Sequence, residues 1–194
     1  MAIGRPRAFD TEKALDQALG VFREKGYEGA SLSDLTAAMG INPPSLYAAF
    51  GNKEALFGKA LDRYAERHAG FYKDALARPT AREAVEALLA GAIDMATDAG
   101  SPRGCLLVSG ALACGDDADP IRAELTRRRA EGELMLRRRF EQAKREGDLP
   151  PDTSPADLAR YVTTVLQGMA VQAAGGAGRK DLRRVAETAL RVLP

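Results

Sequence analysis

Apolar residues recur along the chain at intervals of three and four positions, the spacing that places side chains on one face of an α-helix. The pattern begins after Asp10 and Thr11, with Ala14, Ala18 and Phe22 on one stripe. Alternating runs rich in valine, isoleucine and threonine, which would indicate strands, are absent. We therefore predict an all-α protein of about nine helices.

Two short helices follow a first helix that Gly26 is placed to end, and each is bounded by residues that begin or end helices. Ser31 starts the first of them in an S-x-x-D signal, and Gly40 ends it. Asn42 is placed to cap the second, in which two prolines occupy the first turn, and Gly51 ends it. Both helices are expected to span about two turns.

These two helices and their turn form a helix-turn-helix arrangement over residues 31–50, whose second helix can enter a DNA major groove. A plain helical hairpin without a DNA role fits the pattern equally well. Within the second helix, Leu46 and Phe50 are spaced to anchor it to a core, and Ile41 would fill the corner of the turn. The remaining face is small or polar, which favours DNA binding.

Several residues of this segment are candidates for DNA contacts. Ser45 could bond a phosphate or a base edge, and Ala48 could touch a thymine methyl group. Tyr47 could reach a phosphate, although a structural role is an equal alternative. Lys53, at the start of the next helix, combines a charge with a helix N-terminus, and both attract phosphate.

The segment before the first helix contains Arg5 and Arg7. Basic arms of this type can enter a minor groove, and an unstructured tail without DNA contact is the alternative. The formal net charge of the chain is only +1, so it lacks the strongly basic balance that is typical of nucleic-acid binders. DNA binding would therefore depend on the local placement of such residues.

The fourth helix is expected to run from Lys53 toward Ala77 and to connect a DNA-binding head, 1–60, with a body, 61–194. The body is predicted to contain helices at 81–99, 104–114, 120–146, 155–175 and 179–193. The arginine runs at 127–129 and 137–139 lie among glutamates on a long helix. A solvated face with i,i+4 pairs is favoured there over a second DNA-binding surface.

The helix at 155–175 is apolar on more than one side, which suits a helix that lies in a dimer interface. The last helix could pair with it across a twofold axis. The dimer-face candidates are Leu158, Val162, Val165, Leu166, Leu182, Val185 and Leu190.

A small-molecule pocket is expected in the body, because methionine lines adaptable apolar pockets, although it more often fills ordinary cores. The pocket candidates are Met95, Cys105, Leu106, Leu107, Met135, Phe140 and Met169. Cys105 follows an arginine and a possible helix start, so a reactive thiol is an alternative to a buried structural one. Cys114 would lie on the opposite face of the same helix, so we expect no disulfide between the two.

Enzymatic activity has little support in the chain. His68 is the only histidine and has no catalytic partner in motif spacing. No phosphate-binding loop, paired-carboxylate motif or metal-ligand cluster is present, so we predict no catalytic residues, cofactor or metal. A helical small-molecule-binding protein without a DNA role is a further alternative. The absence of long apolar runs predicts a cytoplasmic protein without a membrane partner.

The run YEGASLSDLTAAMGINPPSLYAAFGNKEALF at residues 27–57 resembles the N-terminal domain of the TetR family of repressors. The resemblance covers about residues 5–60, while residues 81–194 match no family segment beyond being helical. It depends on an ordered set of elements, which are Gly26-Tyr27, the Ser31 cap, Met39-Gly40-Ile41, Leu46-Tyr47, Phe50 and Lys53-Glu54-Ala55-Leu56-Phe57.

The resemblance implies a homodimeric repressor that binds a palindromic double-stranded operator and is released by a small, largely apolar inducer bound in the body. The DNA-reading positions that it implies are Pro43, Pro44, Ser45, Tyr47 and Ala48, with phosphate contacts from Ser31, Ser33, Asn42, Tyr47 and Lys53. The chain departs from many members at Ala48 and Ala49, where larger polar side chains are common. Base readout there is expected to be weak.

Overall fold

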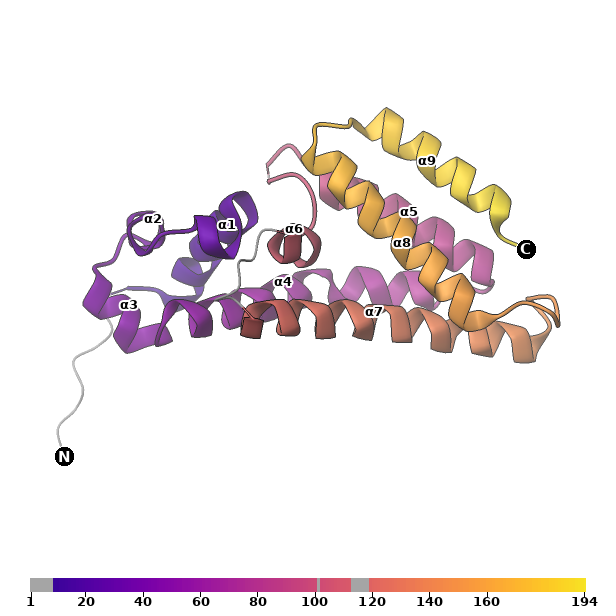
Figure 1. The fold of residues 1–194 in the computed structure, drawn as a ribbon, viewed down its shortest axis with the longest axis horizontal. Helices are drawn as coiled ribbons and strands as arrows, with labels where there is room; N and C mark the ends of the chain where they lie inside the picture. The colour runs from indigo at the N-terminus through magenta and orange to yellow at the C-terminus, as the bar shows by residue number, and fades with distance from the viewer. Residues whose placement is uncertain (1–8, 101, 113–118) are drawn as a thin grey trace.

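A computed structural model describes residues 9–100, 102–112 and 119–194, and within these residues the chain forms nine helices and no strand (Figure 1). The helices are α1 (Thr11–Gly29), α2 (Leu32–Met39), α3 (Pro43–Phe50), α4 (Lys53–Leu76), α5 (Ala81–Thr97), α6 (Leu106–Leu112), α7 (Asp119–Glu146), α8 (Pro155–Ala174) and α9 (Arg179–Val192). The predicted all-α fold is confirmed.

The first helix begins and breaks at the residues that the sequence indicates. The Asp10 carboxylate accepts hydrogen bonds from the amides of Glu12 and Lys13, at 2.9 and 3.2 Å, and so caps α1. Gly26 has a φ of 71°, which interrupts the helix, although a last turn continues to Gly29. The predicted end at Gly26 is therefore a kink followed by one further turn.

The start of α6 differs from the predicted helix at 104–114. Gly104 has a φ of +93°, a left-handed conformation that cannot continue from or into an α-helix. The Cys105 carbonyl then accepts hydrogen bonds from the amides of Val108 and Ser109, at 3.0 and 2.9 Å. The helix begins at Leu106 as a result, two positions later than expected.

The helices pack around two hydrophobic cores. The N-terminal core contains Leu19, Phe22, Leu35, Leu46, Phe57, Leu61 and Tyr64 from α1–α4, together with Leu106, Ile121 and Leu125 from α6 and α7. The C-terminal core contains Ala75, Val85, Leu89, Leu136, Phe140, Val162, Met169 and Leu182. The predicted boundary at residue 60 stays a prediction, and packing changes from one core to the other within α4, between Tyr64 and Ala75.

Both α4 and α7 extend through the two cores, and Figure 1 shows these two long helices side by side along one edge of the molecule. Their N-terminal halves pack in the N-terminal core and their C-terminal halves in the C-terminal core, so the helices run in the same direction. Through these two helices, the position of the first three helices is linked to that of the body.

The arginine runs on α7 divide into exposed and buried members. Arg127 and Arg137 form the expected i,i+4 ion pairs with Glu131 and Glu141, at 2.5 and 2.8 Å. Arg139 is a correction to the solvated-face prediction, because only 7% of it is exposed. Its guanidinium donates to carbonyls at and just beyond the end of α4, where carbonyls have no amide partners within the helix. These acceptors are Leu76 at 3.1 Å and Arg78 and Pro79 at 3.0 Å.

Candidate DNA interface

A capping box and an ion pair from α1 fix the start of α2. The Ser31 hydroxyl accepts a hydrogen bond from the Asp34 amide, and the Asp34 carboxylate accepts one from the Ser31 amide, each at 3.0 Å. Lys25 of α1 donates to the same carboxylate at 2.6 Å. Lys25 first, and then Ser31, lower the pKa of Asp34 to about 2. The predicted cap is confirmed. The ion pair between Lys25 and Asp34 ties α2 to α1.

The turn between α2 and α3 has the geometry that its glycine permits. Gly40 lies in the left-handed region with a φ of 65°, and the amide of Ile41 donates to the Thr36 carbonyl at 3.1 Å. The Ile41 side chain is half-buried against the N-terminal core. It therefore fills the corner of the turn, as the sequence predicts.

The start of α3 leaves its backbone little capacity to bind an anion. Pro43 and Pro44 have no N–H, and the next two amides are already bonded to Asn42. The Ser45 amide donates to the Asn42 side-chain oxygen at 2.9 Å, and the Leu46 amide donates to the Asn42 carbonyl at 3.1 Å. Side chains, rather than this helix N-terminus, must make the contacts to DNA.

The outer face of α3 is exposed, and apart from Tyr47, which is 49% exposed, its residues are small or polar, as predicted. Leu46 and Phe50 are buried and hold the helix on the N-terminal core. The structure brings most of the candidate contact residues together on this face and at the turn before it, and the exposed ones are Asn42, Pro43, Pro44, Tyr47 and Ala48. Ser45 is half-buried, Ser31 and Ser33 are exposed at the start of α2, and Arg5 and Arg7 lie outside the described residues.

Lys53 is held close to the surface by an aromatic ring. Its ammonium lies 4.6 Å from the centre of the Tyr27 ring, a distance typical of a cation–π contact. Tyr27 in turn packs edge-on against Phe57 of α4, with 5.1 Å between ring centres. Burial lowers the pKa of Lys53, and the carboxylate of Glu28 opposes that shift. The sequence pattern includes Tyr27 in the family resemblance but does not predict its contact with Lys53. The available signal is an aromatic residue directly after Gly26.

The seven pocket candidates do not line a single cavity. Met135 is 45% exposed on α7, and its role in a pocket stays a prediction. Cys105, Leu106 and Leu107 pack on the N-terminal core, Phe140 and Met169 are buried in the C-terminal core, and Met95 is half-buried on α5. An apolar hollow between α5, α8 and α9 has no room for a water-sized molecule. Drug-sized ligand sites typically have volumes of about 300–1,000 Å³, so this hollow is not a site of that size.

Cys105 makes a polar contact with a residue of the N-terminal core. It is half-buried, and the Tyr64 hydroxyl donates to its sulfur at 3.5 Å. Burial raises the pKa of Tyr64, which keeps this hydroxyl a neutral donor. The arginine expected beside the thiol, Arg103, donates instead to the Gly176 carbonyl at 3.2 Å. Cys114 lies outside the described residues.

The dimer-face candidates separate into buried and exposed residues. Val162 and Leu182 are 2% and 1% exposed in the protomer core and so leave little surface for a partner, and their role in the dimer face stays a prediction. Leu158, Val165, Leu166 and Leu190 are half-buried against the same core. Val185 is 43% exposed. Val192, which belongs to the apolar pattern of the last helix, is 65% exposed, and Val171, which sequence reasoning missed, is 44% exposed.

His68 has a packing role in this arrangement. Its ring lies edge-on to Tyr64 with 4.5 Å between ring centres, and burial lowers its pKa. Within the described part of the chain, no group of three or more His, Cys, Asp or Glu side chains could hold a metal ion. Among the same residues, no helix has the length and apolar character needed to cross a membrane.

Two family models match the chain, one near its N-terminus and the other over the body. The model described as "Bacterial regulatory proteins, tetR family" matches residues 14–60, and "Tetracyclin repressor-like, C-terminal domain" matches residues 81–189. The second match covers the body, for which the sequence pattern suggested no family segment.

Relatives of known sequence are transcriptional regulators, not enzymes. The HTH-type transcriptional repressor ComR of Escherichia coli (strain K12) is 35% identical over 193 residues, which cover 98% of this chain and 92% of ComR. The HTH-type transcriptional repressor BdcR of the same strain is 39% identical over 109 residues, which cover 55% of each chain.

A solved structure has nearly the same fold as the whole chain. A cysteine-substituted form of the TetR family transcriptional regulator CifR, complexed with 26-bp double-strand operator DNA, is 45% identical. It superposes with a TM-score of 0.95, over 98% of this chain and 100% of CifR.

Proposed function

Because the chain belongs to the TetR family of transcriptional regulators, we propose that it is a homodimeric repressor of a palindromic operator, released by a small, largely apolar inducer. The observation that carries the proposal is the face of α3, which is exposed and, apart from Tyr47, made of small or polar side chains, while Leu46 and Phe50 anchor the helix from behind. A backbone with such small side chains can lie deep in a major groove.

The contacts to DNA divide by chemistry. Pro44, Ser45 and Ala48 face the base edges, where Ala48 packs on thymine methyl groups and Ser45 bonds a base or phosphate. Asn42 uses its side-chain oxygen to cap α3, and its amide nitrogen donates to a phosphate. Lys53 contributes a charge at the start of α4. Each half-site therefore supplies only a few base contacts, so specificity requires both half-sites at the correct spacing.

The dimer face consists of α8 and α9. Both helices bury one side in the C-terminal core, and they leave the apolar side chains of Val171, Val185 and Val192 exposed. Exposed apolar surface of this kind is removed from water most simply by a second copy of the same face. Four helices, two from each protomer, then pack around the twofold axis.

Release by an inducer requires that the body influences the head. The support for this step is the continuity of α4 and α7 through both cores, since a change in body packing would displace the head. A thermal-unfolding screen of hydrophobic compounds tests it, because a ligand at 100 times its Kd adds about 2.7 kcal/mol to stability. Compounds that raise the Tm should also weaken operator binding. Operator affinity that is unchanged by every such compound would contradict release.

The operator itself can be found by footprinting. We expect the purified protein to protect a stretch of DNA in the promoter region of its own gene, with two symmetric halves about one helical turn apart or a multiple of it. Protection should weaken steeply as salt rises, because phosphate contacts release counterions. An absence of protection anywhere in that region would count against the regulator function.

A further inference from the structure

Polar contacts tie α4 to α7 at two points along the two helices. At the far end, Arg139 of α7 is buried and donates to three carbonyls at and beyond the C-terminus of α4. Three bonds from one buried guanidinium leave that end of α4 little freedom to shift. This end is therefore the natural fixed point for a change in the direction of α4.

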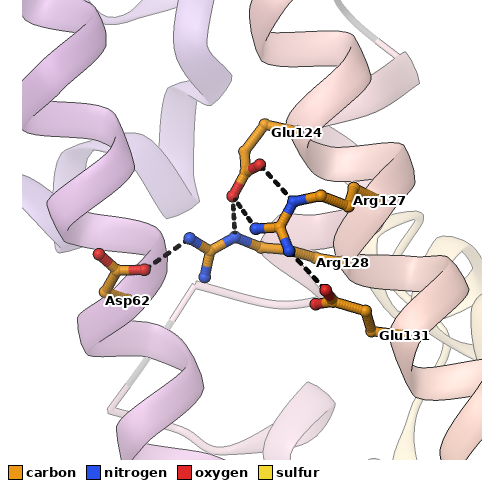
Figure 2. Close-up of polar contacts among 5 residues, drawn as sticks. All are labelled: Asp62, Glu124, Arg127, Arg128 and Glu131. Atoms are coloured by element: carbon orange, nitrogen blue, oxygen red, sulfur yellow. Dashed lines mark hydrogen bonds and ion pairs between the residues drawn. The ribbon is translucent and has the colours of Figure 1, made fainter.

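The second tie lies 11 residues earlier on α7. Arg128 donates from Nη2 to the Asp62 carboxylate of α4 at 2.5 Å, and from Nε to Glu124 of its own helix at 2.6 Å (Figure 2). Its side chain is only 15% exposed, whereas that of Asp62 is 63% exposed. Arg128 is thus a largely buried cation that reaches across from α7 to α4.

Neighbouring residues hold Arg128 in this orientation. Glu124 accepts bonds from Arg128 and also from Arg127, which in turn pairs with Glu131 (Figure 2). Arg127, as the largest cause, lowers the pKa of Glu124 to about 2, so this carboxylate is ionised at neutral pH. Burial acts against the charge of Arg128, but Asp62 and Glu124 outweigh it and raise its pKa. The cross-helix pair therefore approaches α4 from a pre-ordered network.

A small rotation of α4 has a large effect at the DNA. The helix rises about 1.5 Å per residue, so Lys53 lies about 35 Å from Leu76. A rotation of about 5° around the Arg139 end would move the start of α4 by about 3 Å. That displacement is close to the rise of one base pair, because about 10 base pairs span about 34 Å.

We propose that the Arg128–Asp62 ion pair is a positioning contact for operator binding: it fixes the direction of α4 and thereby the separation of the two recognition helices in the dimer. The inference depends on the proposed function, because the separation of the two recognition helices affects binding only when a dimer contacts both half-sites of an operator. Neither residue contacts DNA in this account, and both act through the placement of α3.

The test measures affinity for three DNAs: the footprinted operator, the operator with one base pair inserted or removed between its half-sites, and a single half-site. Asp62→Ala and Arg128→Gln should weaken binding to the native operator about two- to fivefold, the effect of losing a partly exposed ion pair. The affinity of both variants for the operator with altered spacing should fall less, and their affinity for the single half-site should stay unchanged. Arg137→Gln, which removes an ion pair within α7, is the matched control and should behave as wild type.

The double variant separates positioning from general damage. If the two residues act as one contact, the Asp62→Ala/Arg128→Gln protein should bind no more weakly than Arg128→Gln alone. Wild-type spacing preference in both single variants would overturn the proposal. Equal losses on the operator and on the half-site would overturn it too, because a folding defect weakens both. A wild-type protein without any operator binding would refute the proposed function itself, and this inference with it.

Discussion

Arg139 shows how much one buried side chain stabilises the end of a helix. Its guanidinium satisfies carbonyls at and beyond the end of α4, and replacing it leaves those acceptors in the protein interior without donors. We expect Arg139→Met to lower the free energy of unfolding by about 2–3 kcal/mol, measured by denaturant titration at fixed protein concentration. Arg138→Met, at the exposed neighbouring position, is the control. Equal stability of the two variants would contradict the capping role.

Asp34 predicts a pH dependence at the start of α2. Its folded-state pKa of about 2 lies below the ordinary value, so its contribution to stability is complete above about pH 4 and is lost as the pH falls toward 2. Lys25 is the largest cause, and Lys25→Met should raise the pKa of Asp34 in a carboxyl NMR titration. Lys13→Met, near the start of α1, should leave the pKa of Asp34 unchanged. A titration near pH 4 in the wild-type protein would refute the ion pair.

At the scale of single residues, the sequence predicts roles that depend on spacing along one helix. Leu46 and Phe50 are recognisable as anchors because they are four positions apart. Tyr27 and Arg139 are not recognisable, since the partner of one is the Lys53 ammonium and that of the other a turn some 60 positions away. Their roles come from tertiary contacts that no local pattern encodes.

Among the elements, α3 depends on one cap. Two prolines remove the first amides, and the Asn42 side chain accepts the bond from Ser45. Asn42→Ala should therefore lower the free energy of unfolding by about 1 kcal/mol, measured by denaturant titration. Asn42→Asp should preserve stability, because aspartate also caps, while its negative charge repels phosphate and weakens operator binding. Operator binding by Asn42→Asp that equals wild-type binding would show that Asn42 does not face the DNA phosphate backbone.

Helix ends are predictable where the chain itself marks them. Ser31 caps α2 through its own side chain, as the sequence indicates, and Thr80 and Ser154 do the same for α5 and α8. The start of α6 is less predictable, because Gly104 adopts a positive φ where its backbone approaches Ala170 of α8. A Cβ at Gly104 would lie 3.2 Å from the Ala170 carbonyl oxygen. That constraint comes from packing between distant segments.

For the whole molecule, the dimer face predicts the oligomeric state. Val171→Asp and Val185→Glu place a charge and its symmetry mate in an apolar interface, at a cost of several kcal/mol. We expect the Kd of the dimer to rise at least about 100-fold, so that sedimentation shows monomers at micromolar concentration. Leu134→Glu, at a similarly exposed apolar position on α7, should remain dimeric. Dimers in both interface variants would show that the face lies elsewhere.

The sequence could not separate protomer core from partner surface on α8 and α9. Val162 and Val171 are both apolar and both lie on α8, yet one is buried and the other 44% exposed. Periodicity shows that a helix has more than one apolar side, but it does not show which side packs within the chain. The same ambiguity applies to the pocket candidates Phe140 and Met135, which are both apolar residues of α7 although one lies in the core and the other on the surface.

The central claim is that α3 reads a specific operator as part of a dimer. Fluorescence anisotropy measures it most directly, with the footprinted fragment and a fragment of scrambled sequence titrated at the same physiological salt concentration. The account predicts two protomers per operator and an affinity at least about a thousandfold greater than for the scrambled DNA. Equal affinity for the two fragments would contradict it.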